Sequence, residues 1–287
     1  MSLSCALISD PYAMQRCSLK WKAEGKTIGL VTTMGCLHEG HISLVKEARR
    51  KADRVVVSIF VNPLQFAPNE DFAVYPRPFE RDVELCKEAG ADVIFCPKMS
   101  DIYPRGSSIR LEGGWLAKQY CGWSRPTFFN GVLTVVSILF QIVQPTFSIF
   151  GEKDFQQLHF IKRMCKDGFV PVEVIGMPTI REPSGLAMSS RNTYLSPEQK
   201  ERAASIYKSM CELRDTVRAG HTDVQALLSK LKNCLKTQED IQLDYACLVD
   251  LKTMEPLGDN LTGPARLLVA AYMGKSPRIR LIDNILV

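Results

Sequence analysis

The chain has 287 residues, which is longer than one hydrophobic core usually supports, so the sequence predicts two domains. Hydrophobic residues make up 46% of the chain and charged residues 23%, a composition that excludes an intrinsically disordered protein. The formal net charge of +5 is spread along the chain without a block of lysine and arginine, so it favours small anionic substrates at least as much as nucleic acid.

Cysteine spacing and apolar runs indicate the compartment. Ten cysteines occur, but no two have the C-x-x-C spacing and none lies in a cluster with histidine, which favours the reduced thiols of a cytoplasmic protein over zinc or disulfides. The first apolar piece is interrupted by Asp10-Pro11 without a basic region before it, so we expect no targeting segment. The longest apolar run, Gly131–Val143, is too short to cross a bilayer and predicts a buried helix or a subunit contact.

In chain order, the first informative stretch is Val31–His41. Apolar Ile28–Val31 predicts a strand, and the apolar spacing of residues 42–48 predicts a helix. The turn between them brings His38 and His41 to the first helical turn, on one face because they are three residues apart. A helix start offers backbone N–H groups and partial positive charge, and a neutral imidazole donates hydrogen bonds, so this turn is a candidate phosphate site.

Two other interpretations of the histidine pair stay open. The pair could bind a metal, but the zinc-protease pattern His-Glu-x-x-His needs one more residue between the histidines. A third ligand would also have to come from His159 or His221. Alternatively, both are ordinary surface histidines, and Glu39 is an acidic residue placed favourably in a first helical turn.

Strands and helices alternate through the first part of the chain. The predicted strands are Ile28–Val31, Arg54–Val61, Asp92–Phe95, Phe147–Phe150 and Val172–Ile175. The predicted helices after the histidine turn include Phe79–Ala89 and Phe155–Lys166. This order predicts an α/β fold, a doubly wound Rossmann-like parallel sheet with helices on both faces. Ligands of such sheets bind beyond the carboxyl ends of the strands, where the polar loops of this chain fall.

Three further polar loops follow predicted strands. Asn62 and Gln65 offer amide donors and acceptors for a polar substrate, although an Asx turn before proline would explain Asn62 alone. Lys153 stands at a strand–helix junction, with Gln157 one helical turn further on, and is either a phosphate contact or surface charge. The stretch Met188–Asn192 has two hydroxyls and a guanidinium, which suit a triphosphate, but a plain interdomain loop has the same composition.

A second domain is predicted after this last loop. Ser196 is the predicted N-cap of a helix that runs to Ala219, with Gln199 completing a capping box. A second predicted helix, Val224–Leu235, precedes the predicted strands Ile241–Val249, Arg266–Tyr272 and Arg280–Ile285. We therefore expect a Rossmann-like domain of residues 1–182 and a smaller C-terminal α+β lid domain of residues 183–287.

Several sequence blocks carry a specific resemblance to a known family. They read TMGCLHEGHISLV, FVNPLQF with NEDF and YPR, GVLTVV, FGEKDFQQL and REPSGLAMSSRNTYLS, in this order between residues 33 and 196. Together they resemble the pantothenate synthetases, or pantoate–β-alanine ligases, of the nucleotidyltransferase superfamily with an HIGH-type motif. His38-Glu39-Gly40-His41 matches that motif, and residues 188–191 take the place of its partner loop.

The resemblance implies an ATP-dependent ligase of pantothenate biosynthesis that also uses Mg²⁺. Pantoate would attack the α-phosphorus of ATP, release pyrophosphate and form pantoyl adenylate. The amine of β-alanine would then attack the acyl carbon, giving pantothenate and AMP. The resemblance also implies a homodimer, and we expect neither a nucleic acid nor a membrane as a partner.

The resemblance assigns site residues by position. ATP would be bound by Met34, Gly35, Cys36, Leu37, His38, Glu39, Gly40, His41, Gly151, Glu152, Lys153, Asp154, Ile180, Met188, Ser189, Ser190 and Arg191. The catalytic residues among them would be His38, His41, Lys153 and Arg191. Pantoate would be held by Gln65 and Gln157, with Asn62, Tyr75 and Arg125 in the substrate region, and Gln65 would also meet β-alanine. No metal ligand is predicted.

The chain departs from the usual family pattern at five positions. Two of the changes are small: Thr32 and Cys36 stand where a proline and an alanine are usual. Cys121, Thr127 and Phe128 stand where a glutamate, a glycine and a histidine are usual. Two alternative functions stay open, and these departures bear on the second. One is an adenylyltransferase of the same fold with another acceptor, and the other is a catalytically silent nucleotide-binding regulator.

Overall fold

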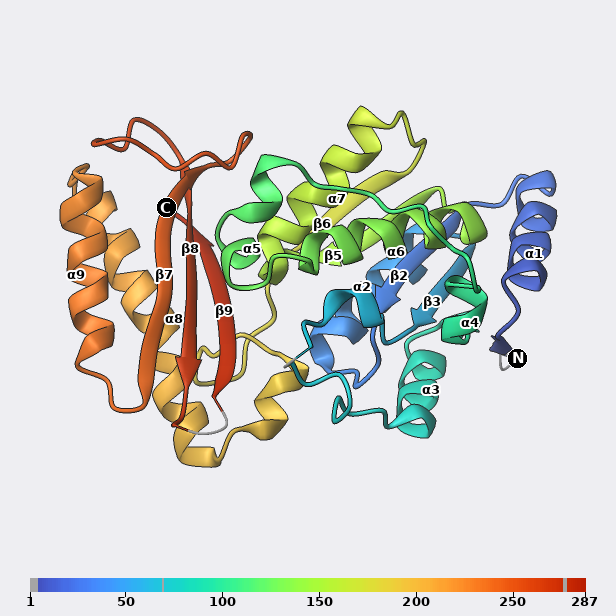
Figure 1. The fold of residues 1–287 in the computed structure, drawn as a ribbon, viewed down its shortest axis with the longest axis horizontal. Coiled ribbons are helices and arrows are strands. Elements are labelled where there is room, and N and C mark those ends of the chain that lie inside the picture. The colour runs from blue at the N-terminus through green and yellow to red at the C-terminus, as the bar shows by residue number, and fades with distance from the viewer. Residues whose placement is uncertain (1–4, 69, 276–277) are drawn as a thin grey trace. The chain divides into compact units, whose positions relative to one another are not determined.

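The structure, a computed structural model, describes residues 5–68, 70–275 and 278–287. The chain forms two compact units (Figure 1). The first comprises the chain up to Glu152 together with Gln156–Pro178, and the second comprises Lys153–Phe155 and Thr179–Val287. The predicted domain boundary after residue 182 stays a prediction. Contacts between residues divide the chain after Pro178 and place residues 153–155 in the second unit.

The first unit contains a six-stranded parallel sheet in the order β1-β4-β3-β2-β5-β6. The strands are β1 Ala6–Ile8, β2 Ile28–Thr33, β3 Arg54–Ile59, β4 Val93–Phe95, β5 Phe147–Gly151 and β6 Glu173–Met177. The chain moves from β2 to β3 on one side, and later from β5 to β6 on the other. The predicted doubly wound parallel sheet is confirmed, and its topological switch point lies between β2 and β5.

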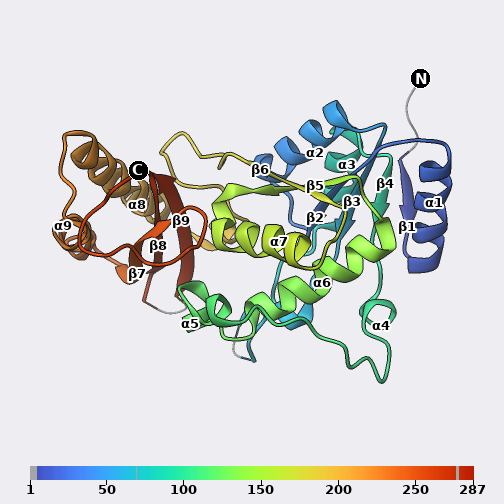
Figure 2. The same ribbon diagram turned by 90° about the horizontal axis from the view of Figure 1, so that it is seen from above.

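Helices cover both faces of this sheet, as Figure 2 shows for α2 and α3 on one side and α6 and α7 on the other. The helices of this unit are α1 Pro11–Ala23, α2 Glu39–Lys51, α3 Phe79–Glu88, α4 Met99–Ile102, α5 Cys121–Ser124, α6 Phe128–Val143 and α7 Phe155–Asp167. Short 3₁₀ turns occur at η1 Pro63–Gln65, η2 Trp115–Lys118 and η3 Glu152–Asp154. Neighbouring strand residues face opposite ways, so Val56 packs in one apolar core while Val55 and Val57 pack in the other.

The apolar run Gly131–Val143 forms most of α6 and is buried inside this unit. It therefore needs no subunit contact to leave water. Gly131 lies against η1, where an added Cβ would stand 2.2 Å from the carbonyl oxygen of Leu64. No helix in the described ranges has the length and apolar character needed to cross a membrane.

The N-terminal elements β1 and α1 are absent from the sequence prediction. Asp10-Pro11 is expected only to interrupt an apolar piece, but Asp10 is the N-cap of α1, and its Oδ1 accepts the backbone N–H of Ala13 at 2.6 Å. Proline at the first helical position fits this geometry because it needs no backbone donor there. The three residues of β1 are too few to show a strand period, and β1 is set by pairing with β4.

The second unit is a three-stranded antiparallel sheet with two long helices, as predicted. Its elements are η4 Ser190–Tyr194, α8 Pro197–Arg218, α9 Val224–Lys236, β7 Ile241–Asp250, β8 Ala265–Met273 and β9 Ile279–Leu286. The predicted capping box is confirmed: Ser196 Oγ accepts the N–H of Gln199 at 3.3 Å, and Gln199 Oε1 accepts the N–H of Ser196 at 3.0 Å. Leucines of α9 and alternate residues of β8 share one apolar core.

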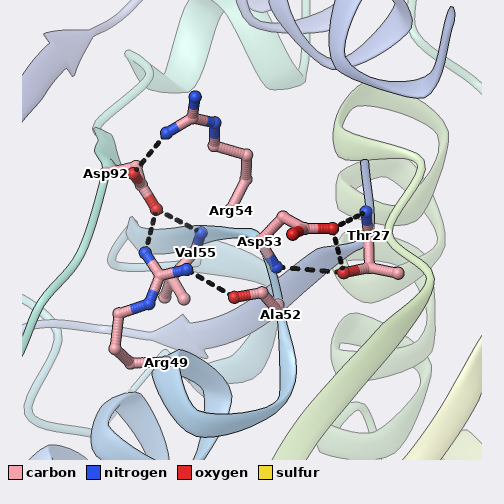
Figure 3. A network of polar contacts seen from close by, with 7 residues as sticks. All are labelled: Thr27, Arg49, Ala52, Asp53, Arg54, Val55 and Asp92. Atoms are coloured by element: carbon pink, nitrogen blue, oxygen red, sulfur yellow. Dashed lines mark hydrogen bonds and ion pairs between the residues drawn. The ribbon is translucent and has the colours of Figure 1, made fainter. Parts of the chain in front are cut away.

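A buried carboxylate joins the amino ends of the central strands (Figure 3). Asp92, just before β4, accepts the backbone N–H of Val55 at 2.7 Å and hydrogen bonds from Arg49 at 2.7 Å and Arg54 at 3.0 Å. The side chain of Asp92 is 8% exposed. This network lies at the sheet edge opposite the carboxyl ends of the strands, so we assign it to stability.

Candidate active site

The candidate nucleotide loop leaves the carboxyl end of β2 at the switch point. Gly35 and Cys36 both have left-handed backbone conformations, with φ of 80° and 51°. Glycine adopts this conformation easily, whereas a residue with a side chain such as Cys36 is strained there. The strained turn must therefore be held by contacts from elsewhere in the fold.

Asp82 of α3 supplies those contacts. Its carboxylate accepts the backbone N–H of Cys36 at 2.7 Å and that of Leu37 at 2.8 Å, and the residue is 1% exposed. Burial raises the pKa of the Asp82 carboxyl, while the two N–H donors act in the opposite direction. Asp82 is absent from the residues predicted from sequence, although its place beside buried Val83 on the apolar face of α3 was a detectable signal.

The two histidines cap the helix that follows the loop. His38 is the N-cap of α2, and its Nδ1 accepts the backbone N–H of Gly40 at 3.1 Å. His41 Nδ1 accepts the N–H of His38 at 3.4 Å, and the two ring centroids are 4.1 Å apart. The neutral tautomer that allows both Nδ1 atoms to accept carries its proton on Nε2. In this tautomer the Nε2 atom of each imidazole is an N–H donor.

Most backbone donors of this turn already have acceptors within the protein, which differs from the expectation of available N–H groups. Gly35 N–H donates to Thr33 Oγ1 at 3.2 Å, and the next N–H groups are bound by Asp82 and by the histidines. A phosphate at this turn would therefore be recognised mainly by side chains. The side-chain donors nearest to this helix start include the Nε2–H groups that the two imidazoles carry in the neutral tautomer described above.

The loop after β3 holds Asn62 and Gln65 close together. Asn62 Nδ2 donates to Gln65 Oε1 at 2.9 Å and to the carbonyl oxygen of Gly131 at 3.0 Å. Asn62 Oδ1 accepts the hydroxyl of Tyr103 at 2.8 Å and the N–H of Leu64 at 3.3 Å. The Asx turn considered for Asn62 is therefore present, and the same side chain also contacts Gln65.

The other predicted substrate residues occupy distinct environments in the first unit. Tyr75 is 6% exposed and packs edge-on against Phe66. Arg125 donates two hydrogen bonds to Glu70, at 2.7 and 2.8 Å, and one to the carbonyl oxygen of Gln65 at 2.9 Å. Its guanidinium lies 3.8 Å from the ring centroid of Phe128. Phe128, one of the departures from the family pattern, thus supports Arg125 through a cation–π contact.

The adjacent glutamines of α7 separate into two roles. Gln156 is buried and uses its whole amide, accepting from the backbone of Cys121 and donating to the carbonyls of Leu116 and Gln119. Gln157 is partly exposed, and none of the described residues hydrogen bonds to its side chain. The structure thus leaves Gln157, the predicted pantoate residue, available to a ligand.

Of the remaining candidates, Gly151 and Glu152 end the first segment of the first unit, and the others belong to the second unit. Lys153 follows Gly151 and Glu152 at the end of β5, and its Nζ lies 3.6 Å from Asp154, while Asn284 binds its carbonyl oxygen at 2.8 Å. Ile180 O accepts the N–H of Met188 at 3.0 Å. Ser189 is the N-cap of η4, which contains Ser190 and Arg191, and its Oγ accepts the N–H of Arg191 at 3.3 Å.

The loop that carries Ser189–Arg191 is braced by a buried ion pair. Arg181 donates to both carboxylate oxygens of Asp283, at 2.6 and 2.9 Å, and stacks on Tyr207 at 3.6 Å. Asn192 donates to Glu182 at 2.8 Å. These contacts hold the Met188–Arg191 backbone in a defined conformation.

A preformed metal cage is absent from the described residues. No group of three or more histidine, cysteine, aspartate or glutamate side chains in that part of the chain could hold a metal ion. The metal interpretation of His38 and His41 therefore lacks further ligands. No disulfide joins any of the ten cysteines, all of which the structure describes.

The fold and these loops define a class of protein. Paired imidazoles stand at a helix start at the switch point of a doubly wound parallel sheet, and polar loops follow the neighbouring strands, as in α/β proteins that bind nucleotides.

Comparison with known proteins defines the family. Residues 6–286 match the sequence model of the family described as Pantoate-beta-alanine ligase, and the chain belongs to that family. The pantothenate synthetase of Syntrophobacter fumaroxidans is 45% identical over 97% of both chains. That of Desulfatibacillum aliphaticivorans is 46% identical over 97% of this chain and 98% of the relative.

Solved structures show the same fold. Pantothenate synthetase from Thermus thermophilus superposes with a TM-score of 0.90 at 42% identity, covering 97% of this chain and 98% of that one. Pantoate-beta-alanine ligase from Francisella tularensis, solved in complex with beta-gamma ATP and beta-alanine, gives a TM-score of 0.79 at 36% identity. That match covers 99% of this chain and 98% of the other.

Proposed function

We propose that this protein is an ATP-dependent ligase that joins pantoate to β-alanine through pantoyl adenylate, with AMP and pyrophosphate as the other products. The observation that carries the proposal is the family match over residues 6–286. The ligand-bound relative from Francisella tularensis supports ATP and β-alanine as substrates. The arrangement of donors around the β2 loop supports the same chemistry.

In the first step, a carboxylate oxygen of pantoate attacks the α-phosphorus of ATP, and the bond to the pyrophosphate oxygen breaks. Phosphoryl-type transfer needs little covalent help and depends on positioning and on positive charge around the phosphates. The Nε2–H groups of His38 and His41 would donate to the phosphate oxygens. Lys153 and Arg191 would supply cationic charge to the departing pyrophosphate.

In the second step, the neutral amine of β-alanine attacks the acyl carbon of the adenylate. The bond between that carbon and the phosphate oxygen breaks, AMP leaves with the oxygen that pantoate contributed, and the nitrogen releases one proton to solvent. Gln65 and Gln157 would hold pantoate through both steps, since the NH₂ group of Gln65 and the side-chain amide of Gln157 have no hydrogen-bond partner among the described residues. Tyr75 and Arg125 would support the Gln65 loop.

Magnesium would enter with ATP. Mg²⁺ usually keeps several waters and binds substrate phosphates with only one or two protein carboxylates, so it needs no dedicated cage. When bound, it would neutralise part of the phosphate charge.

Two further proposals concern the assembly and location of the protein. We propose a homodimer, on the family resemblance alone, because α6 is already buried within its own unit. We also propose a cytoplasmic enzyme, which the ten cysteines without a disulfide support.

The decisive experiment follows an oxygen atom. Pantoate labelled with ¹⁸O in its carboxylate is incubated with ATP, Mg²⁺ and β-alanine, and AMP is analysed by mass spectrometry. The proposed route transfers one ¹⁸O to AMP. Exchange of labelled pyrophosphate into ATP should require pantoate and proceed without β-alanine.

Other results would point elsewhere. Unlabelled AMP would contradict the adenylate intermediate. Exchange that requires a different acceptor would favour an adenylyltransferase of the same fold. Tight ATP binding without exchange for any acid would favour the silent nucleotide-binding protein.

A further inference from the structure

The orientation of the Asn62 amide is fixed by backbone atoms. The N–H of Leu64 can only donate, so the Asn62 atom that it contacts at 3.3 Å is the oxygen. The carbonyl of Gly131 can only accept, so the atom that contacts it at 3.0 Å is the nitrogen. Asn62 is 1% exposed, and both of its N–H groups and its oxygen are used within the protein.

This orientation determines that of Gln65. The second N–H of Asn62 points at the Gln65 side chain at 2.9 Å, and only the Gln65 oxygen can accept it. The Gln65 NH₂ group therefore faces away from Asn62. No described residue hydrogen bonds to this NH₂ group. Its nitrogen is also not among the fully buried, unpaired polar atoms of the described residues. Gln65 is 8% exposed, so this NH₂ group is the part of the amide that a ligand can reach.

Tyr103 completes the chain of hydrogen bonds. Its hydroxyl donates to Asn62 Oδ1 at 2.8 Å. Its ring contacts Phe60, with centroids 6.2 Å apart, and the Arg110 guanidinium lies 5.4 Å from the ring centroid. Burial raises the pKa of Tyr103 to about 12, so the phenol keeps its proton and remains a donor.

We propose that Tyr103 is a positioning residue that acts through Asn62 to present the NH₂ group of Gln65 to an oxygen of the acid substrate. This inference rests on the proposed function and assigns a residue that the motifs did not. A donor at this position recognises a carboxylate or hydroxyl oxygen, such as those of pantoate. It repels an ammonium group, which also only donates. Asn62 itself would not touch the substrate.

The first test compares two tyrosine-to-phenylalanine variants, each of which loses one phenolic hydroxyl. Tyr103→Phe keeps both ring contacts and removes only the hydroxyl, and Tyr12→Phe removes a hydroxyl that is exposed on α1. Initial rates are measured with pantoate and ATP varied separately. We expect Tyr103→Phe to raise KM for pantoate about three- to tenfold, the range for one neutral hydrogen bond, and to leave KM for ATP unchanged. Tyr12→Phe should match the wild type.

A second variant tests the direction of the amide. In Asn62→Asp the atom facing Gln65 becomes an acceptor, so the Gln65 NH₂ group can turn inward and leave its oxygen facing the substrate. KM for pantoate should then rise further than in Tyr103→Phe. If Asn62→Asp does not fold, the Tyr103→Phe comparison decides alone.

The outcomes separate this inference from the proposed function. Wild-type protein without pantoate-dependent exchange would overturn the function and the inference with it. Active wild type with an unchanged pantoate KM in Tyr103→Phe would overturn only the inference. Equal changes in KM for pantoate and ATP, or a loss of kcat alone, would also overturn it, because they indicate a general structural defect.

Discussion

The carboxylate of Asp82 accepts a 2.7 Å hydrogen bond from the backbone N–H of Cys36, 46 residues earlier in the chain. This bond holds Cys36 in a left-handed conformation that a residue with a side chain adopts only at a cost. A second bond from Leu37 to the same carboxylate completes the brace. The shape of the nucleotide loop thus depends on a residue of α3.

Replacing Asp82 should therefore weaken ATP binding. In Asp82→Asn the amide keeps one acceptor, but its NH₂ group confronts a backbone N–H, so the loop must shift. We expect KM for ATP to rise at least about fivefold, equivalent to one unmade hydrogen bond of about 1 kcal/mol. The matched control is Asp92→Asn, a buried carboxylate at the opposite edge of the same sheet. An equal rise of KM for ATP in both variants would contradict the role of Asp82.

The Asp92 network should contribute to stability without affecting catalysis. Asp92→Ala leaves the N–H of Val55 unpaired and two arginines without their shared partner. Because the arginine side chains are 29% and 34% exposed, we expect a loss of about 2–3 kcal/mol, below the ~3–5 kcal/mol of a fully buried pair. Urea denaturation measures this loss. The control Glu47→Gln breaks the surface pair with Arg50 and should change stability little, and an equally small effect of Asp92→Ala would contradict the assignment.

The proposed catalytic cations and donors can be tested one at a time. Lys153→Ala and His41→Ala should each lower adenylate formation by ~100-fold or more, the scale for loss of a preorganised transition-state contact. Both proteins should remain folded, since neither side chain belongs to an apolar core. Pantoate-dependent exchange of pyrophosphate measures the step, with exposed Lys46→Ala on α2 as the control. If Lys153→Ala or His41→Ala shows near wild-type exchange, the residue replaced in that variant has no role in the mechanism.

The free energy of unfolding of the first unit should depend on pH through His159. Burial lowers the pKa of His159 below its ordinary value, with smaller contributions in the same direction from Arg163 and Lys162. A depressed folded-state pKa means that the neutral form stabilises the fold above the unfolded pKa of 6.5, and that this contribution is lost as pH falls. Wild type should therefore lose stability relative to His159→Gln between about pH 7 and pH 5. Parallel urea titrations at these pH values test this, and a pH-independent difference would refute it.

The proposed homodimer has a direct measurement. Light scattering at micromolar concentration should give about twice the chain mass of 32.2 kDa. Because α6 is buried within its own unit, the proposed dimer does not depend on the apolar run Gly131–Val143. Trp123 is 81% exposed and offers a position at which to test the interface. If Trp123 lies in the interface, Trp123→Glu should yield monomers, whereas a monomeric wild type would end the proposal.

Local patterns in the sequence determined much of the fold. The alternation of apolar runs with amphipathic stretches predicted β2 to β6 and the helices α2, α3 and α7. Capping chemistry placed the start of α8 at Ser196-Pro197, and the three C-terminal strands followed from their apolar residues. These features are local because hydrogen bonds and side-chain periods within a helix or strand involve neighbouring residues. The motif blocks in the sequence likewise indicated the family.

Only the tertiary structure decided how the site is supported. The hydrogen bonds Asp82–Leu37, Tyr103–Asn62 and Asn62–Gly131 join residues 45, 41 and 69 positions apart. No period or cap encodes such pairs, because they form only when separate strands and helices pack on one another. The same packing commits Asn62 to protein partners and leaves the Gln65 NH₂ group to a ligand, although the sequence presents both as equivalent polar amides. Whether a polar side chain binds a ligand or supports the fold depends on which of its donors and acceptors already have partners in the folded protein.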